Sequence, residues 1–320
     1  MDSIKVATFN VENLFARFQF RRNVKDPEKI IRDGWTVNHT YFSIYNETAK
    51  AITAETIKAL DADVLALQEV ENLDTLRKFR TDYLGGRKGY PYAIIIDGND
   101  PRRIDVALLS RYPLANIQTH SHLWSTELRW YLFSRDCLVA DVQGPGGFTF
   151  TLFVNHFKSM LDRGDPKNGR QNTRHKRLVQ SRAVKQIVTA KFGTNAGTYP
   201  FVVLGDFNDY LQADEQGESG ITELVEWDQV VNVVDRLPED EHWTHFFKGS
   251  SSGSLNPVYH QLDYLLLSKS LAERNLHSPH IERRGLPRRA SQYSGERFPG
   301  VGQNSPKASD HCPIVMELQF

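Results

Sequence analysis

Residues of the types that bind metals and transfer protons stand at the ends of several apolar segments of this sequence. Four strand-like segments, VATFN, VLALQE, FTLFVNH and VVLGDFN, finish on Asn10, Glu69, Asn155, His156, Asp206 and Asn208. Three others, RIDVALL, QLDYLLLS and SDHCPIV, open on Asp105, Asp263, Asp310 and His311. If the first group of strands runs opposite to the second, all of these side chains meet at one edge of a sheet, where they could form an active site.

The chemistry open to such a cluster is that of a hard divalent cation and two imidazoles. Carboxylate and amide oxygens favour Mg²⁺ first and Mn²⁺ second, and such a cation polarises a phosphoryl oxygen. A histidine beside it can bond a phosphate oxygen or transfer a proton near neutral pH. The sequence has neither a cysteine ligand pair nor an H-E-x-x-H motif, which disfavours a structural or protease-type zinc site. A single Asp after a strand more often caps a turn, but metal-binding or proton-transferring residue types at the ends of all seven segments favour a site.

The elements that would position these residues are short β-strands with helices between them. Apolar runs rich in β-branched residues and bounded by Gly, Pro, Asn or Asp predict the strands. Apolar residues at helical spacing predict helices over residues 47–60 and 177–192. The mixture predicts an α/β fold with a mixed or antiparallel sheet. Since there is no internal repeat and no long linker, we expect one domain over residues 1–320.

Charge is balanced overall but separated along the chain. The 320 residues carry 39 Lys and Arg and 39 Asp and Glu, so bulk positive charge would not hold the protein on nucleic acid. Residues 163–185 and 279–309 are basic, whereas residues 209–241 are acidic. Such runs are often solvated surfaces, but the basic ones could also line a substrate site, and residues 279–309 form a long segment of low regularity.

Composition also gives expectations about location. No apolar stretch approaches the roughly 20 residues that cross a bilayer, and the N-terminal MDSIKVATFN has no signal-peptide pattern. We therefore expect a cytoplasmic protein with no membrane association, unless a secretion signal was trimmed. Two cysteines, Cys137 and Cys312, cannot form a disulfide framework. The sequence shows no obligate protein partner.

The ordered motifs resemble those of a known group of enzymes. TFNVEN, LALQEVEN, IDVALLSRYP, VNHFKS, VVLGDFND, QLDYLLLS and SDHCPIV are similar to the successive motifs of the endonuclease/exonuclease/phosphatase (deoxyribonuclease I-like) superfamily. FNVENLF, EVEN and NHFKS look most like its bacterial branch of predicted nucleases. The resemblance implies a four-layer α/β sandwich, with two mixed β-sheets packed face to face and helices outside.

The resemblance also implies a metal site. Glu69 would be the principal Mg²⁺ ligand, with Mn²⁺ as the second choice of ion. Asn10 and Asp310 would complete the site, directly or through water.

Matching the motifs one by one gives roles to the other strand-end residues. Asp206 would orient or deprotonate the attacking water, and Asn208 would hold that water or the phosphate. His311 would contact the scissile phosphate while Asp263 fixes its tautomer, and His156 would bond another phosphate oxygen. Both Asp206 and His311 remain candidates for the base, with Asp206 preferred because it is better placed to reach water.

Further residues are candidates for binding substrate or supporting the site. RRIDVALL offers Arg103 as a phosphate contact and Asp105 as the partner that orients His156. Arg135, Lys158 and Asn155 are additional substrate-binding candidates, although Asn155 alone is also typical of a turn or ladder residue. The tyrosine that helps to activate substrate in apurinic-site enzymes has no clear counterpart. The basic segment 279–309 lies outside the shared motifs, and we interpret it as a substrate-facing loop.

Two functions follow, and a third is disfavoured. The leading hypothesis is a Mg²⁺-dependent phosphodiesterase that hydrolyses nucleic acid by metal-assisted in-line attack of water. Against it stand the neutral net charge and the lack of an obvious aromatic platform for single strands. The alternative is a phosphodiesterase or phosphatase acting on a small-molecule, inositol or lipid phosphoester. A non-catalytic binding module would be expected to have lost metal-binding or histidine residues, and none is missing here.

Overall fold

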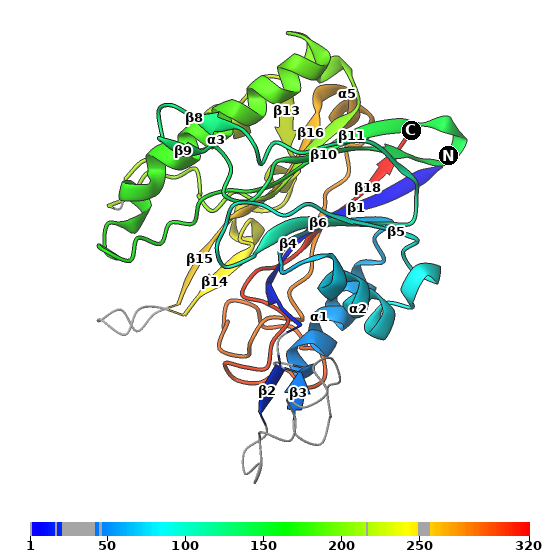
Figure 1. The fold of residues 1–320 in the computed structure, drawn as a ribbon, viewed down its shortest axis with the longest axis vertical. Helices are drawn as coiled ribbons and strands as arrows, with labels where there is room; N and C mark the ends of the chain where they lie inside the picture. The colour runs from blue at the N-terminus through cyan, green and yellow to red at the C-terminus, as the bar shows by residue number, and fades with distance from the viewer. Residues whose placement is uncertain (1, 17, 21–41, 45–46, 216, 249–256) are drawn as a thin grey trace, which may run out of the picture.

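The computed structural model describes residues 2–16, 18–20, 42–44, 47–215, 217–248 and 257–320. Two six-stranded sheets form its centre (Figure 1). The first sheet has the strand order β17-β18-β1-β4-β6-β5 and the second has the order β13-β16-β12-β11-β10-β7. Each sheet contains both parallel and antiparallel neighbours. The predicted four-layer α/β sandwich with two mixed sheets is therefore confirmed.

The strands of the two large sheets are short, with the exception of the first. The first sheet contains β1 (Ser3–Leu14), β4 (Val64–Val70), β5 (Tyr92–Ile95), β6 (Asp105–Ser110), β17 (His280–Ile281) and β18 (Ile314–Gln319). The second sheet contains β7 (Leu114–Gln118), β10 (Leu138–Gln143), β11 (Thr149–His156), β12 (Phe201–Asp206), β13 (Val230–Asn232) and β16 (Asp263–Ser268). Three two-stranded pairs stand apart: β2 (Phe18–Phe20) with β3 (Phe42–Ile44), β8 (Trp124–Ser125) with β9 (Trp130–Tyr131), and β14 (His245–Phe247) with β15 (Val258–His260).

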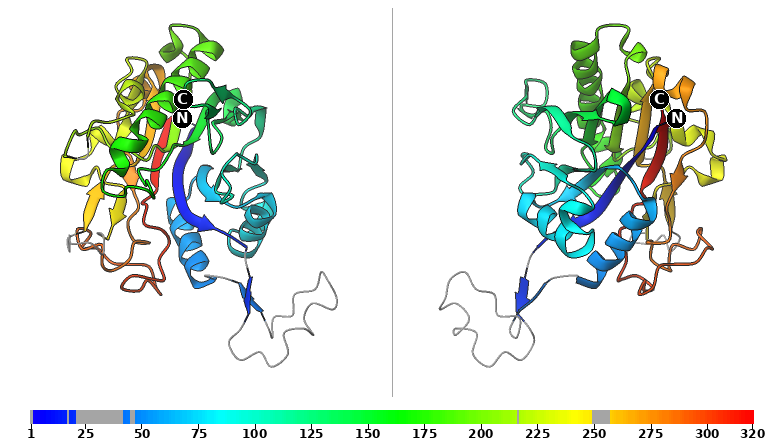
Figure 2. Two further views of the ribbon diagram at one scale, coloured as in Figure 1. Left: turned by 60° about the vertical axis from the view of Figure 1, so that its left-hand side comes forward. Right: turned by 90° about the vertical axis from the view of Figure 1, so that its right-hand side faces the viewer.

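Helices form the outer layers. The α-helices are α1 (Glu47–Leu60), α2 (Leu73–Tyr83), α3 (Gly169–Phe192), α4 (Thr222–Val225) and α5 (Lys269–Arg274). The described residues also contain the 3₁₀ segments η2 (Gly86–Lys88), η3 (Pro145–Gly147), η4 (Ala196–Thr198), η5 (Val233–Arg236) and η6 (Glu239–Glu241). Figure 2 shows α1 and α2 beside the first sheet and α3 on the far side of the second. The predicted helix over residues 47–60 is confirmed, whereas the helix predicted over 177–192 begins earlier, at Gly169.

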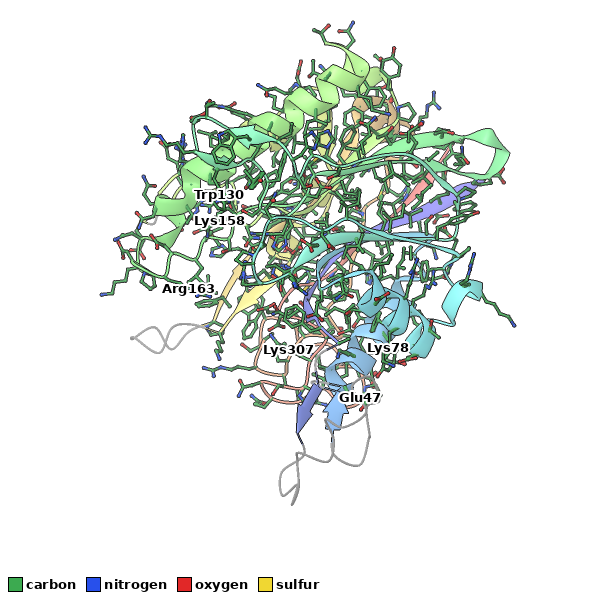
Figure 3. All side chains as sticks on the ribbon, in the orientation of Figure 1. Glu47, Lys78, Trp130, Lys158, Arg163 and Lys307 are labelled. Carbon is green, nitrogen blue, oxygen red and sulfur yellow. The ribbon has the colours of Figure 1, made fainter. Side chains whose placement is uncertain are left out.

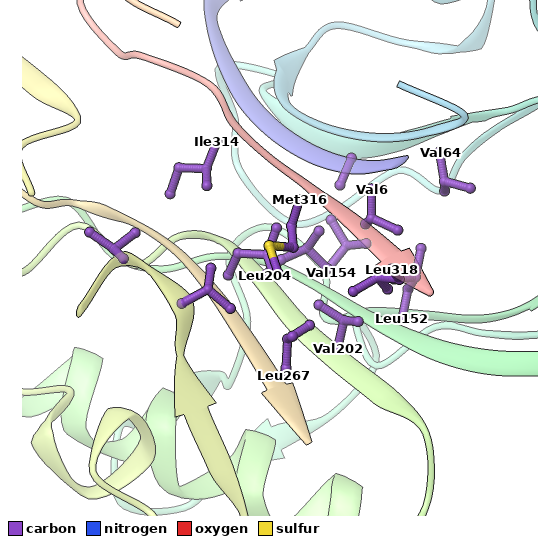
Figure 4. Packing of buried hydrophobic residues seen from close by; sticks show 14 of the residues in the cluster. Val6, Val64, Leu152, Val154, Val202, Leu204, Leu267, Ile314, Met316 and Leu318 are labelled. Carbon is purple, nitrogen blue, oxygen red and sulfur yellow. The ribbon is translucent and has the colours of Figure 1, made fainter. Parts of the chain in front are cut away.

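Strands buried on both faces explain the nearly continuous apolar runs in the sequence. On β4, Val64 and Ala66 point into the core between the sheets, while Leu65 and Leu67 pack in the cluster that contains α1 and α2. The same alternation on β12 sends Val202 and other residues into the central core, shown close up in Figure 4. Three apolar clusters therefore separate the four layers. No helix in the described part of the chain is long and apolar enough to span a membrane.

Strand direction brings the polar strand ends together. In the first sheet β1 and β4 are parallel, and β18 and β6 run against them. In the second sheet β11 and β12 are parallel, and β16 runs against them. The C-terminal ends of β1, β4, β11 and β12 thus lie beside the N-terminal ends of β6, β16 and β18. The polar residues that end the first group of strands and begin the second group therefore lie at one edge, as the sequence pattern predicted.

Candidate active site

The polar edges of the two sheets meet at Asp206. The amide Nδ2 of Asn10, on the first sheet, donates to Asp206 Oδ2 on the second sheet at 2.9 Å. Within the second sheet, His156, Asp206 and Asp263 occupy neighbouring register positions on β11, β12 and β16. Residues far apart in the sequence are therefore joined in one cluster, as expected from the strand ends.

Asp206 is the centre of this cluster. Its carboxylate accepts hydrogen bonds from the backbone N–H and the Nδ2 of Asn208, each at 2.8 Å. The Nε2 of His156 lies 3.5 Å and the Nε2 of His311 3.9 Å from Asp206 Oδ2. Burial raises the pKa of Asp206 to about 7, against the opposing charge of His311. A carboxyl with such a pKa can accept a proton near neutral pH.

The backbone before and after Asp206 is specialised. Gly205 has φ 137°, and a Cβ added there would come within 1.9 Å of the carbonyl oxygen of Asn155 on the neighbouring strand. Any residue with a Cβ atom would require the backbone of the neighbouring strand to move, so only glycine fits here. Asn208 follows with φ 53°, a left-handed conformation that Asn tolerates better than most residues. The glycine and the asparagine of VVLGDFN thus have steric reasons to be there.

His311 is held as a cation. Its Nδ1 lies 2.8 Å from Asp263 Oδ2, which leaves Nε2 directed toward Asp206. Burial alone would lower the pKa of His311, but the negative charges of Asp263 and Asp206 raise it well above its usual value. The ring of His245 packs against it with 4.6 Å between ring centroids, and burial lowers the pKa of His245 to about 3. The site therefore contains one imidazolium beside a neutral imidazole.

His156 stands on the other side of Asp206 and is neutral. Its ring is buried, and burial together with the charge of Arg135 holds its pKa well below the usual value. The predicted pairing of His156 with Asp105 is wrong. Asp105 Oδ1 instead accepts from the backbone N–H of Gly98 at 3.0 Å, and His156 Nδ1 has no well-formed hydrogen bond within the described chain. The loop before β6 approaches so closely that a Cβ on Gly98 would lie 2.7 Å from that carboxylate.

Glu69 reaches the site from a bulge. The pairing of β4 with both neighbours shifts register around it, and its φ of 68° is a strained value for a residue with a side chain. Its Oε2 accepts from the backbone N–H of Asn13 at 3.0 Å, and its Oε1 lies 4.0 Å from His156 Nε2. Burial raises the pKa of Glu69, and the nearby charge of Asp310 raises it further.

Glu12 is a carboxylate of the site that the sequence interpretation missed. Its Oε2 contacts Lys307 Nζ at 2.7 Å and accepts from the backbone N–H of Asp310 at 3.0 Å. Burial and Asp310 raise the pKa of Glu12 to about 7. Lys307, also missed, lies 3.8 Å from Asp310 Oδ2. Neither residue follows an apolar run, so the strand-end pattern gave no signal for them.

The donor set fits a hard cation. Glu69, Glu12 and Asp310 are carboxylates, and the charge of Asp310 adds to burial in raising the pKa of both Glu69 and Glu12, as expected where acidic groups are crowded together. Asn10 Oδ1 accepts from the backbone N–H of Glu12 at 3.0 Å and retains a second lone pair. The tightest groups of metal-ligating atoms found in the described residues are different: His245 with Asp310 and His311, and Asp206 with Asp263 and His311. The negative charges of Asp263 and Asp206 raise the pKa of His311 well above its usual value, which disfavours it as a ligand, and oxygen donors such as those around Glu69 suit a hard cation better.

The predicted substrate contacts are mostly occupied by the protein itself. Arg135 is buried, donates to the carbonyl of Phe157 and lies 3.3 Å from Asp100 Oδ2. Lys158 Nζ donates to the carbonyls of Ser159 and Leu161, each at 2.8 Å.

The remaining two candidates differ in accessibility. Asn155 is buried, and its side-chain Nδ2 donates to the carbonyl of Phe153 at 2.9 Å, so it serves the strand rather than the substrate. Arg103 is exposed, with φ 56°. Its neighbour Arg102 is bonded to Asp100, so Arg103 stays the predicted phosphate contact of this loop.

The basic stretch 163–185 is neutralised largely by the acidic stretch 209–241. Arg170 and Arg177 lie on α3 with side chains that are fully buried, and each places its Nε 2.8 Å from an oxygen of Asp209. Further along α3, Arg174 pairs with Glu218 and Arg182 pairs with Glu223. The interpretation of this stretch as a substrate-lining surface therefore fails for these four arginines, because they hold α3 to the segment after β12.

The basic segment 279–309 also uses its arginines internally. Arg297 donates to the carbonyls of Leu286, Gly295, Ala290 and Tyr293. Arg284 forms a bidentate pair with Glu282, and Arg283 lies over the ring of Trp243. The segment is thus a folded loop, and it brings Lys307 to the site.

Comparisons with known proteins agree with this geometry. The sequence pattern of the Endonuclease/Exonuclease/phosphatase family matches residues 7–311. No curated protein sequence matches the chain significantly.

Solved structures of the same fold include a truncated TDP2 from Caenorhabditis elegans, with 16% identity and a TM-score of 0.58 over 99% of this chain and 98% of that one. The human Nocturnin catalytic domain with bound sulfate has 17% identity and a TM-score of 0.60 over 99% and 94%. D. rerio TDP2 complexed with a single-strand DNA product has 15% identity and a TM-score of 0.57 over 100% of both chains.

The family pattern spans nearly the whole chain and includes every strand end that meets at Asp206. The chain therefore belongs to the endonuclease/exonuclease/phosphatase family, and it is a hydrolase of phosphoric esters.

Proposed function

We propose that the chain is a Mg²⁺-dependent phosphodiesterase that cleaves nucleic acid by in-line attack of water. The observation that carries the proposal is one buried carboxylate, Asp206, held by two amides between a neutral imidazole and an imidazolium. This arrangement offers a base, a hydrogen-bond donor and a positive charge within one water-excluded cluster.

Each residue of the cluster has a distinct task. Asp206 orients the water through Oδ2 and accepts its proton, since its pKa of about 7 suits a base near neutral pH. His311 is already protonated, which supports Asp206 rather than His311 as the base. The Nε2–H of His311 donates to a phosphate oxygen, while Asp263 holds the ring. Asn10 and Asn208 fix the carboxylate of Asp206 through their side-chain N–H groups.

Glu69, Asn10 and Asp310 would hold the cation, with Mg²⁺ as the ion of choice and Mn²⁺ as a substitute. The bound cation would supply positive charge to the phosphoryl oxygens as negative charge develops there. His156 is neutral and faces both Glu69 and Asp206, so it can bond a second phosphate oxygen without repelling the cation.

Nucleic acid is the preferred substrate, and one observation favours an alternative. The D. rerio TDP2 structure of the same fold contains a single-strand DNA product, which supports nucleic acid here. Against this, the pairing of four α3 arginines with acidic residues leaves fewer cations to bind a polyanion. A small, inositol or lipid phosphoester is therefore the second candidate.

The test is hydrolysis by the purified protein with Mg²⁺, with Mn²⁺ and with EDTA. The substrates are plasmid DNA, a single-stranded oligonucleotide, bis(p-nitrophenyl) phosphate and p-nitrophenyl phosphate. We expect metal-dependent cleavage of the nucleic acids and of the diester, lost in Asp206→Asn. The control is Asp141→Asn, which alters a buried carboxylate on β10, remote from the strand ends of the site, that accepts hydrogen bonds from Asn116 and Thr151. Cleavage of the synthetic diester alone would move the substrate to small molecules, and cleavage of the monoester alone would refute a diesterase.

A further inference from the structure

A small hairpin displays aromatic side chains at the surface. Strands β8 and β9 pair only with each other, placing Trp124 opposite Tyr131 and Ser125 opposite Trp130. The two tryptophans are 56% and 52% exposed. Large aromatic side chains gathered in water mark a binding surface more often than a scattered single residue does.

The three rings of this aromatic hairpin (Trp124, Trp130 and Tyr131) fix one another. Trp124 and Trp130 lie with 6.4 Å between centroids at an angle of 48°. Tyr131 meets them edge-on, at 5.6 Å and 76° from Trp124 and at 5.9 Å and 82° from Trp130. Edge-to-face packing holds rings in place and leaves their faces available. The exposed indoles are therefore pre-oriented and lose little conformational entropy on binding.

The hairpin is attached to the candidate active site through its return strand. Gln180 of α3 donates to the carbonyl of Leu132 and accepts from the backbone N–H of Lys158, which follows the His156 strand. Asn99, in the loop before β6, donates to the carbonyl of Phe133 at 3.1 Å. Figure 3 labels Trp130 and Lys158 on the same side of the molecule. Five residues after Trp130 comes Arg135, whose charge acts on Glu69 and Asp206.

Cations surround the hairpin. Arg129 is exposed and precedes Trp130 directly, and Lys176 of α3 donates to Ser134 Oγ at 2.9 Å. Arg102 lies on the side of Glu69, but its guanidinium is already paired with Asp100 at 2.9 Å. The acidic residue of the hairpin, Glu127, is already paired with His175 at 3.2 Å. Cations interleaved with aromatic faces are the combination that binds unpaired nucleic acid.

We propose that the aromatic hairpin is a stacking platform for unpaired bases next to the scissile phosphate, so that the substrate class is single-stranded nucleic acid. This inference rests on the proposed function. A duplex keeps its base faces stacked inside the helix and offers nothing for the indoles to stack on. Trp124 and Trp130 are six positions apart in the sequence, and the pairing of β8 with β9 brings them together on one surface.

The experiment compares the binding of two ligands by tryptophan variants, all made in the inactive Asp206→Asn background. We would measure fluorescence anisotropy of a labelled single-stranded oligonucleotide and of a matched oligomer with the same phosphates but abasic sugars. Trp124→Ala and Trp130→Ala should each weaken binding of the normal oligonucleotide about fivefold to 150-fold, as expected for one lost base stack. Neither should weaken binding of the abasic oligomer, because that ligand has no base to lose.

The control variant is Tyr199→Ala. Tyr199 is 48% exposed and lies just before β12, whose far end carries Asp206. It should leave both affinities unchanged. Equal losses on the normal and abasic ligands, unchanged binding by the tryptophan variants, or tighter binding to duplex or to anionic lipid vesicles would each overturn the proposal.

A separate readout distinguishes this inference from the proposed function. Hydrolysis of bis(p-nitrophenyl) phosphate, measured in the wild-type background, should be unaffected by Trp124→Ala and Trp130→Ala. If the diester and the single strand are cleaved equally by wild type and variants, the phosphodiesterase stands and the platform is refuted. If the single strand binds through the tryptophans but no substrate is hydrolysed, the platform stands and the proposed reaction fails.

Discussion

The buried ion cluster around Asp209 should decide how stable this protein is. Asp209 is fully buried and accepts from Arg170 Nε, Arg177 Nε and the backbone N–H of Gly220, each at 2.8 Å. The variant Asp209→Asn keeps the size of the side chain but removes its charge. Its Nδ2 would then face a guanidinium N–H, so that donor meets donor and two buried cations lose their counter-charge.

The expected magnitude follows from the burial. Removing one partner of a buried ion pair costs about 3–5 kcal/mol, because the remaining charge is stranded. Here two guanidinium groups are stranded, although other bonds remain to both: Arg170 also contacts Asp214 and Arg177 also donates to the carbonyl of Arg170. We therefore expect the free energy of unfolding to fall by about 3–5 kcal/mol. That is a large share of the 5–15 kcal/mol typical of folded proteins.

Urea denaturation followed by circular dichroism measures this loss as a lower midpoint at unchanged slope. The matched control is Glu218→Gln, which breaks an exposed pair with Arg174 on the same helix and should leave the midpoint unchanged. A loss below about 1 kcal/mol for Asp209→Asn, the value of an ordinary hydrogen bond, would refute the view that this carboxylate holds α3 to the site. So would an equal loss in both variants.

Three further outcomes are expected. Burial raises the pKa of Asp105 to about 7, so the native state binds the proton of this carboxyl more tightly than the unfolded chain does. The stability that this proton contributes is fully present below about pH 4 and is lost as the pH rises to about 7. Asp105→Asn keeps the oxygen that accepts from the backbone N–H of Gly98 and should remove the loss of stability with rising pH. The denaturation midpoints of the variant and wild type should therefore diverge only as the pH rises. Parallel pH curves would contradict the raised pKa of Asp105. Gly205→Ala should yield misfolded or inactive protein, since its Cβ would lie 1.9 Å from the carbonyl of Asn155, and a variant with wild-type melting would contradict the steric argument. Adding Mg²⁺ should raise the melting temperature of wild type and not of Glu69→Gln; an equal rise in both would remove Glu69 from the metal site.

Much of the fold could be predicted because strand signals are local. Runs such as FVVLGD are apolar on both faces, and this pattern survives whatever the tertiary context. The convergence of Asp206, His156 and His311 followed from strand direction alone. The pairing of His311 with Asp263 is also present as expected from the motifs.

The misses have a different physical origin. Glu12 lies on β1 two residues beyond Asn10, so it is not a strand-end residue, and Lys307 lies in the segment 279–309, whose path local sequence does not determine. The burial of Arg170 and Arg177 did leave a signal. Seven residues is about two helical turns, so these two side chains share one face of α3.

The ion-paired arginines of α3 change how the protein should respond to salt. A protein that grips a polyanion with many cations releases many counterions and loses affinity steeply as salt rises. Here Arg170, Arg174, Arg177 and Arg182 are already paired with acidic residues of the chain itself, so fewer cations can neutralise phosphates and displace counterions from a polyanion. Ring stacking, which needs no counterion, would then contribute a larger share of the affinity. Such an enzyme would attract its substrate less strongly over long distances, but its binding would depend less on ionic strength. Its activity should therefore persist at salt concentrations at which more basic nucleases dissociate from their substrates.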